Sequence, residues 1–345
     1  MLAENTAETL LEDAHADASL AKLTRPYIEA SRARIAPYLH RTPLRRSHTL
    51  SRRLGTNVYL KFEVLQKTGS FKARGAFSKL TALPAGSRVV AASGGNHGQA
   101  VAYAAGVLGM PARIVMPRST AANYLNATRD YGAEIFLTED IGSAFALGEE
   151  AAVDGWIRVH PFDDVDVIAG QGTVGLEILE DLPEVTDVIC SIGGGGLAAG
   201  LGTVIKSAKP DARVWGAETL GADCMSQALE AGRVITMEKI TSIAKTLGPP
   251  SVAAVTLAAA QRLLEKVEVV SDAEAVQALY FLLERVKVLT EPAAACTLAA
   301  AERLAGRFSP DDHLVLVLCG GNLSMADLHS YSALVPVNST PERAE

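Results

Sequence analysis

The sequence predicts an α/β protein that consists of two domains with parallel sheets. The chain has 345 residues, of which 48% are apolar and 21% are charged, so it is long enough for two moderate hydrophobic cores. Short apolar segments alternate with segments of helical spacing from Arg88 onward, which is typical of βαβ units. The 29 glycines also suit an α/β protein better than a helical bundle.

The first part of the chain contains four predicted elements, followed by a boundary. A helix is predicted over residues 27–39 and another over residues 71–83, where Pro84 ends the helical pattern. Strands are predicted at RTPL, which begins at Arg41 and contains a proline that favours extended backbone, and over residues 58–63. Pro84, Ala85 and Gly86 then predict a domain boundary.

Residues 88–165 are predicted to form a small inserted domain. Its strands are expected at residues 88–93, 112–117, 134–138 and 156–160, and its helices at residues 99–108, 121–131 and 143–154. Four apolar strands with intervening helices predict a parallel sheet.

Residues 1–87 and 166–345 are predicted to form the large domain. The later elements are helices at 170–182, 197–207, 222–231, 272–286 and 292–304, and strands at 187–192, 213–218, 267–271 and 313–320. The uncharged residues 188–205 have the length of a short membrane span, but six of the eighteen are glycine, so we predict a strand, a loop and a helix instead.

Composition excludes several classes of partner. The net charge is −7 and no Lys/Arg cluster exceeds short pairs, so no nucleic-acid partner is expected. The four cysteines, at positions 190, 224, 296 and 319, show neither metal-ligand spacing nor a disulfide framework. The acidic N-terminus lacks the features of a signal peptide. We therefore predict a cytoplasmic protein without a membrane segment.

One lysine, Lys72 in the segment QKTGSFKARGA, is the centre of the functional prediction. Ser70 is predicted to cap a helix that begins at Phe71 and Lys72. The positive end of a helix lowers the pKa of an amine, and an amine that is nucleophilic at neutral pH can serve a covalent carbonyl cofactor. Taken alone, a lysine in such a sequence is more often a solvated surface residue.

Five motifs occur in order along the chain: KFEVLQKTGSFKARGA, SGGNHGQAVAYAA, HPFDDVDVIAGQGTVGLEIL, GGGGL and CGGN. Together they resemble the fold-type II pyridoxal-phosphate enzymes, in the branch of threonine/serine dehydratases and serine racemases. The resemblance extends from about Ala30 to Leu328. It implies a tryptophan synthase β-like fold, with two three-layer domains and pyridoxal 5'-phosphate in the cleft between them. It also implies that the cofactor forms an internal aldimine, a Schiff base, with Lys72.

The glycine-rich stretch SIGGGGLAAG follows an apolar strand and precedes a helix, so its backbone N–H groups can surround a phosphate. The predicted phosphate cup consists of Gly193, Gly194, Gly195, Gly196 and Leu197. A dinucleotide site fits this stretch equally well, because Gly194, Gly196 and Ala199 match its glycine pattern. Glu218 then stands where a ribose-binding acid belongs. The lysine motif favours pyridoxal phosphate.

The motif SGGNHG also lies between a strand and a helix, and we predict that it holds a substrate carboxylate. The predicted contacts are Ser93, Gly94, Asn96 and His97. The resemblance implies that Asn96 hydrogen-bonds the ring hydroxyl of the cofactor, and that His97 contributes its backbone. The alternative is a glycine-rich turn with a capping asparagine.

Three further residues are assigned to the cofactor. Glu291 is predicted to cap a helix, and the resemblance places it near the cofactor ring. Cys319 is either a small buried residue or, by resemblance, the group that faces the pyridine nitrogen. Phe71 either stacks beside the cofactor or belongs to the core.

The predicted reaction is that of a dehydratase: a β-hydroxy amino acid, L-threonine or L-serine, is converted to a 2-oxo acid and ammonia, with Lys72 as the base for the Cα proton. A β-replacement enzyme, a γ-elimination enzyme and a racemase of the same fold remain open. So do a dinucleotide-dependent oxidoreductase and a non-catalytic amino-acid-binding relative. A racemase of this family has a serine at the position of Gly94, so we expect little racemisation. We also expect a homo-oligomer, a dimer or a tetramer.

No metal site is predicted. By resemblance, racemase-like members bind a divalent cation after the strand that ends here at Glu218. The corresponding segment, ETLGADC, keeps Glu218 but has Cys224 in place of the second carboxylate, with Asp223 adjacent. Hard cations prefer oxygen ligands, so the site is expected to be weakened.

Overall fold

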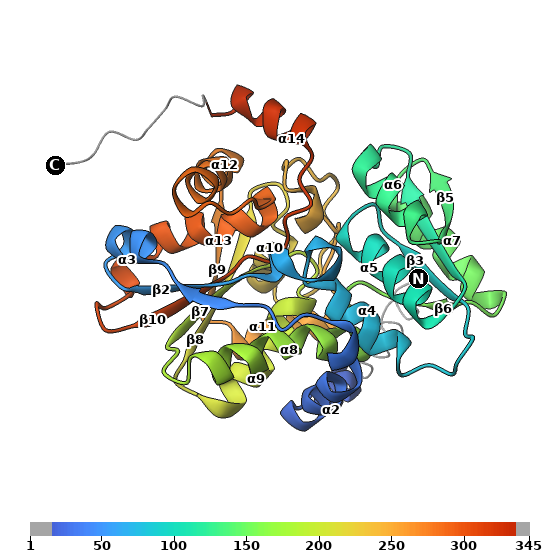
Figure 1. Ribbon diagram of the computed structural model, residues 1–345, viewed down its shortest axis with the longest axis horizontal. Coiled ribbons are helices and arrows are strands. Elements are labelled where there is room, and N and C mark those ends of the chain that lie inside the picture. Colours follow the sequence, from blue (N-terminus) through green and yellow to red (C-terminus); the bar gives the residue numbers. More distant parts are fainter. Residues whose placement is uncertain (1–15, 336–345) are drawn as a thin grey trace.

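The computed structural model describes residues 16–335. Residues 1–15 and 336–345 lie outside the described residues. The prediction that the N-terminus is not a signal peptide falls mostly on the first of these two segments. The described chain forms one sheet of six strands and one of four, with helices around both (Figure 1). Core residues lie on both faces of each sheet, so the prediction of an α/β protein with three-layer units is confirmed.

The six-stranded sheet has the strand order β1-β2-β10-β7-β8-β9. Its strands are β1 (Leu44–Arg46), β2 (Asn57–Lys61), β7 (Asp187–Ser191), β8 (Arg213–Thr219), β9 (Lys266–Val270) and β10 (His313–Val317). All neighbours are parallel except β1 and β2, which are antiparallel. The predicted parallel arrangement is confirmed except for this edge pair, because residues 47–56 are too few for a parallel crossover, which takes roughly a dozen residues.

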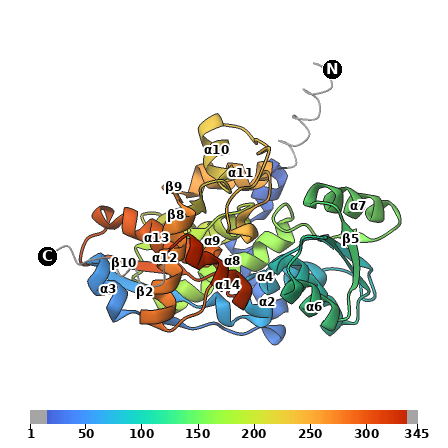
Figure 2. The ribbon, with the colours of Figure 1, turned by 90° about the horizontal axis from the view of Figure 1, so that it is seen from above.

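Two helical layers cover the six-stranded sheet. One consists of α3 (His48–Leu54), α12 (Asp272–Phe281) and α13 (Pro292–Arg303), and the other of α8 (Val165–Asp181), α9 (Gly196–Ala208) and α11 (Ala254–Leu263). Strand β10 contacts both layers, because successive side chains of a strand point to opposite faces. Leu314 and Leu316 join the first core, and Val315 and Val317 join the second. Figure 2 shows α11 beside α10 (Cys224–Ala231) at one edge of the molecule.

The four-stranded sheet is entirely parallel and has the order β5-β4-β3-β6. Its strands are β3 (Val89–Ala92), β4 (Ala112–Pro117), β5 (Glu134–Thr138) and β6 (Ile157–Arg158). Helices α4 (Lys72–Leu80), α5 (Asn96–Leu108) and α6 (Ala122–Asp130) cover one face, and α7 (Ile141–Val153) covers the other. Phe77 and Leu80 of α4 belong to this core although they precede residue 88. The domain division at 88 and 165 stays a prediction.

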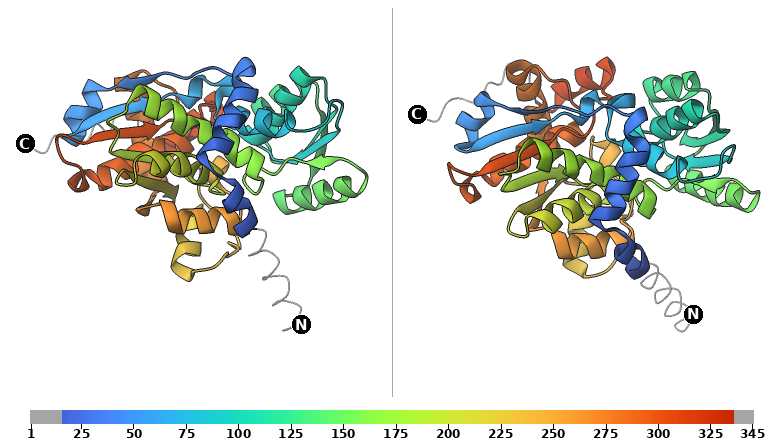
Figure 3. Two further views of the ribbon diagram at one scale, coloured as in Figure 1. Left: turned by 90° about the horizontal axis from the view of Figure 1, so that it is seen from below. Right: turned by 60° about the horizontal axis from the view of Figure 1, so that its bottom comes forward.

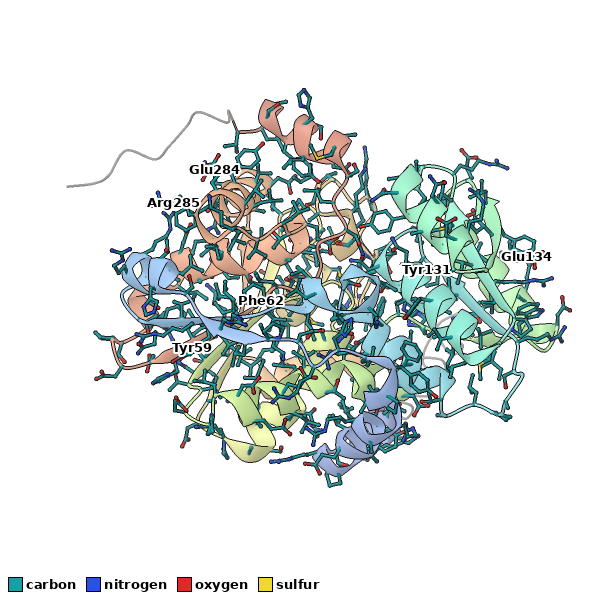
Figure 4. The ribbon with its side chains drawn as sticks, in the orientation of Figure 1. Tyr59, Phe62, Tyr131, Glu134, Glu284 and Arg285 are labelled. Atoms are coloured by element: carbon teal, nitrogen blue, oxygen red, sulfur yellow. The ribbon has the colours of Figure 1, made fainter. Side chains whose placement is uncertain are left out.

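Helix α2 (Arg25–Ile35) packs against α4, α8 and α9, and Figure 3 shows it between the two halves of the molecule. Figure 4 places Tyr59 and Phe62 on the side of the six-stranded sheet, and Tyr131 and Glu134 on the side of the four-stranded sheet. The remaining elements are α14 (Met325–Ser330), the π-helix η5 (Leu282–Val286), and the 3₁₀ helices η1 (Ala36–Tyr38), η2 (Glu63–Leu65), η3 (Lys67–Gly69), η4 (Lys245–Leu247), η6 (Ala305–Arg307) and η7 (Tyr331–Ala333).

Most predicted elements are confirmed within a few residues, but no helix is predicted for the helical residues 16–22 or for α3, α11 and α14. Helix α8 also begins five residues before the predicted start, where Asp164 caps it by accepting hydrogen bonds from the backbone N–H groups of Asp166 and Val167. No helix within residues 16–335 is long and apolar enough to cross a bilayer.

Candidate active site

A cavity of about 530 Å³ lies where the loops after strands β3, β7 and β10 meet. Parallel strands direct their carboxyl ends to one edge of a sheet, and ligand sites of α/β proteins form there. Every residue predicted for the site lines this cavity: Phe71, Lys72, Ser93, Gly94, Asn96, His97, Gly193, Gly194, Gly195, Gly196, Leu197, Glu291 and Cys319. The structure therefore brings the five motifs together, while the role of each residue stays a prediction.

The start of α4 is held by the segment that follows strand β10. Ser70 has extended backbone and forms an antiparallel bridge with Gly320, and the Phe71 N–H donates to the Cys319 carbonyl at 3.0 Å. The prediction that Ser70 caps α4 is wrong, because this bridge turns the serine away from the helix. Phe71 is the N-cap residue and has no side-chain capping bond. The bridge places Lys72 beside the end of the six-stranded sheet.

Lys72 directs its amine into the cavity. The side chain is partly exposed there, and its Nζ donates to the Pro161 carbonyl at 3.0 Å and lies 5.2 Å from the centre of the Phe71 ring. Burial lowers the pKa of Lys72 from 10.5 to about 8. A carbonyl oxygen and an aromatic ring do not hold an ammonium ion as a carboxylate would. About a tenth of the amine is therefore neutral at pH 7, far more than for an unperturbed lysine.

The glycine loop after β7 requires its glycines. Gly195 has φ +89°, in the left-handed region that favours glycine. A Cβ added to Gly194 would lie 2.0 Å from the Phe162 ring, so Phe162 packs directly on the loop backbone. The loop leads into α9, which begins at Gly196 with N–H groups that have no intrahelical partner. Such a helix start is a suitable phosphate site.

The loop after β3 has a similar form. The Ser93 Oγ accepts from the Gly95 N–H at 3.2 Å, and α5 begins at Asn96. The His97 ring donates through Nε2 to the Val159 carbonyl at 2.8 Å. Burial lowers the pKa of His97 to about 3, so this ring is neutral at physiological pH. The imidazole thus has a structural contact, and the role of the His97 backbone stays a prediction.

Glu291 is the centre of a hydrogen-bond network across the cavity. Its carboxylate accepts from Asn96 Nδ2 at 2.7 Å and from the Tyr124 hydroxyl at 3.3 Å. Asn322 Nδ2 donates to Asn96 Oδ1 at 2.7 Å. Glu291 is the N-cap residue of α13 but makes no side-chain capping bond, so its assignment as a helix cap is wrong. Burial raises the pKa of Glu291 to about 7, although its hydrogen bonds oppose this shift.

Sequence reasoning missed several residues of this cavity. Tyr124 lies on α6 and joins Glu291 from the small sheet, and Asn322 was noted only as the end of the CGGN motif. Thr120 and Phe162 line the cavity as well. Asn322 and Phe162 lie within the motifs CGGN and HPFDD, which could have indicated them, whereas Thr120 and Tyr124 lie outside all five motifs.

Cys319 is a buried residue that lines the cavity. Its thiol donates to the Ser191 Oγ at 3.7 Å. Burial raises the pKa of Cys319 well above its usual value, and the Glu291 carboxylate acts in the same direction. The sulfur is therefore a neutral thiol that can donate only a weak hydrogen bond.

The sequence makes Glu218 a candidate ligand of a ribose or of a metal ion, but in the structure its carboxylate caps a helix. Its two carboxylate oxygens accept from the backbone N–H groups of Met225 at 2.9 Å and Ser226 at 2.8 Å, so they cap α10. Asp223 accepts from the Gly221 N–H at 3.0 Å. Within residues 16–335, no cluster of three His, Cys, Asp or Glu side chains could hold a metal ion.

Comparison with known proteins agrees with this geometry. Residues 35–320 match the family described as pyridoxal-phosphate dependent enzyme. An L-threonine ammonia-lyase of Geobacter sulfurreducens is 40% identical over 309 residues, which cover 87% of this chain and 76% of that protein.

Two solved structures have similar folds. A threonine deaminase of T.th. has a TM-score of 0.79 at 40% identity, and the match covers 88% of this chain and 99% of that one. The maize serine racemase has a TM-score of 0.83 at 34% identity, and the match covers 89% of this chain and 95% of that one.

Proposed function

This chain belongs to the family of pyridoxal-phosphate dependent enzymes, and we propose that it is an ammonia-lyase that converts L-threonine or L-serine to a 2-oxo acid and ammonia. Its cofactor is pyridoxal phosphate, so the alternative of a dinucleotide cofactor is wrong. The relatives named as threonine ammonia-lyases and threonine deaminases support this choice of reaction.

The residues of the cavity fit the cofactor. Lys72 offers a partly neutral amine that no carboxylate binds, which a covalent bond to an aldehyde requires. The N–H groups of residues 193–197, at the start of α9, are the proposed phosphate site. Asn96 keeps one amide hydrogen for the ring hydroxyl, because its other contacts use one N–H and the oxygen. Cys319 is proposed to face the pyridine nitrogen of the cofactor. Phe71 is proposed to stack beside the cofactor ring.

The reaction needs a base at the Cα of the substrate. Bound pyridoxal phosphate supplies the electron sink that makes the Cα proton acidic. Lys72, with a pKa of about 8, is the proposed residue that takes this proton. Ser93, Gly94 and His97 are proposed to orient the substrate through its carboxylate. The amino acid loses its β-hydroxyl as water, and one water is added back when ammonia leaves, so no water is consumed overall.

The observation that carries the proposal is the Lys72 amine in the same cavity as two helix starts that suit anions. The test is an assay for 2-oxo acid over a panel of β-hydroxy amino acids, with Lys72→Ala as the control. Oxo acid formation that depends on Lys72 and needs no second substrate supports the ammonia-lyase. Interconversion of L- and D-serine at a comparable rate would instead show a racemase, and product only with an added nucleophile would show a β-replacement enzyme.

The homo-oligomer stays a prediction. Three apolar side chains that are more than half exposed, Leu65, Leu220 and Met325, are candidates for a contact between copies. Sedimentation of the purified protein tests this prediction directly.

A further inference from the structure

Thr120 is a cavity residue to which the mechanism above assigns no role. It follows β4 on the side of the four-stranded sheet and lines the cavity. Its Oγ1 is buried and has no hydrogen-bond partner within the part of the chain that the structure describes. A hydroxyl without a partner is unfavourable in such a place, so a bound group is expected to use it.

The position of this hydroxyl is defined by Gly94. A Cβ added to Gly94 would lie 2.5 Å from the Thr120 Oγ1 and 3.5 Å from its Cβ. The threonine oxygen therefore stands over the loop of residues 93–98, in the space that a side chain at position 94 would occupy. This loop is the proposed carboxylate site.

The other polar side chains of the loop are largely engaged. Asn96 donates to Glu291 and accepts from Asn322, and the His97 ring donates to the Val159 carbonyl. Ser93 accepts from the Gly95 N–H but keeps its own hydroxyl hydrogen. A carboxylate has about four acceptor positions, and Ser93 is the one side chain of the loop that keeps a hydroxyl hydrogen for it. Thr120 adds a second hydroxyl.

We propose that Thr120 is a further substrate-binding residue, whose hydroxyl donates to the carboxylate of the amino acid held by residues 93–98. The inference rests on the proposed function, because it takes the ligand of this loop to be an amino acid. The glycine at position 94 is then explained, since any larger residue would displace the Thr120 hydroxyl.

The experiment measures equilibrium binding of L-alanine, which has the amine and the carboxylate but no leaving group, to the holoenzyme by calorimetry. Thr120→Val is expected to raise the Kd about ten- to hundredfold, the range for loss of a hydrogen bond to a charged group. Thr120→Ser should bind within about threefold of wild type, because it keeps the hydroxyl. Binding of L-alaninamide, which lacks the carboxylate, should not distinguish Thr120→Val from wild type.

Thr128→Val is the matched control. Thr128 is also buried with an unpartnered hydroxyl, but it lies on α6 and does not line the cavity. The proposal is overturned if Thr120→Val and Thr128→Val bind L-alanine equally well. It is also overturned if Thr120→Val weakens L-alanine and L-alaninamide alike, or if the wild type binds no L-alanine. Failure of the proposed function would look different: L-alanine would bind, but no β-hydroxy amino acid would yield an oxo acid.

Discussion

Replacement of Lys72 by methionine is predicted to stabilise the cofactor-free protein at neutral pH. The pKa of this amine falls from 10.5 to about 8 on burial. Because one pKa unit corresponds to about 1.4 kcal/mol, burial of the ammonium disfavours folding by about 3 kcal/mol. This value is an upper limit, since Lys72 faces a cavity that water can enter.

Methionine has a similar length and no charge, but it leaves the Pro161 carbonyl without its donor. The lost hydrogen bond costs about 1 kcal/mol, so the net gain at pH 7 is about 2 kcal/mol. For a chain of 345 residues, the unfolding entropy is roughly 0.7 kcal/mol per degree, and the expected rise in Tm is about 3 °C.

The pH dependence gives the sharper test. A lysine with a lowered pKa in the folded state holds fewer protons there than in the unfolded state between about pH 8 and pH 10.5. The wild type therefore gains stability relative to Lys72→Met as the pH rises through this range. The advantage of the variant should be full below pH 8 and disappear towards pH 10.5.

The assay is thermal unfolding of both cofactor-free proteins at a series of pH values. Lys67→Met, in the preceding 3₁₀ helix η3 and partly exposed, is the control for loss of a positive charge. If Lys72→Met is less stable than wild type at pH 7, or if the difference in Tm does not change between pH 7 and pH 10, Lys72 is not a desolvated amine.

Three other outcomes are expected. Borohydride should fix the cofactor of the holoenzyme to Lys72, and peptide mapping that finds the label on Lys61 would refute this. Activity should survive treatment with EDTA, because both Glu218 oxygens already accept backbone N–H groups; a loss that Mg²⁺ restores would show a cation site. Cys319→Ser should retain most activity, since the buried thiol is neutral, whereas Cys319→Asp should slow turnover; equal losses in the two variants would reduce Cys319 to a packing residue.

The sequence alone predicts the outline of the site, because its parts are short segments that follow strands. The loops at 93–98 and 193–197 and the strand end at Cys319 are each marked by glycines next to apolar runs. Parallel strands bring the loops of each sheet to its carboxyl edge, and the loops of both sheets line the same cavity. That is why every predicted site residue lines one cavity although the motifs lie far apart in the chain.

Local patterns fail where a side chain has two possible partners. Ser70 has the sequence context of a helix cap, but pairing with Gly320 gives it an extended backbone. Glu291 stands at the N-cap position, yet its carboxylate reaches Asn96 and Tyr124 instead. The Tyr124 contact joins residues 167 positions apart, and no periodicity in the sequence contains that information.

The charged residues around α4 also have partners that no local sequence pattern indicates, and these contacts explain how Lys72 is held in place. Arg74 is almost fully buried, and its guanidinium donates to Glu63 at 2.8 Å and to Glu177 at 2.7 Å, while Lys61 donates to Glu177 at 2.5 Å. Charged side chains are rarely buried, so composition alone gives no reason to expect an arginine inside the protein here. A buried cluster of this kind adds little net stability over apolar residues, but a member without its partner is strongly unfavourable. Helix α4 is therefore confined to the orientation that satisfies Arg74, and Lys72, two residues earlier on the same helix, is confined with it.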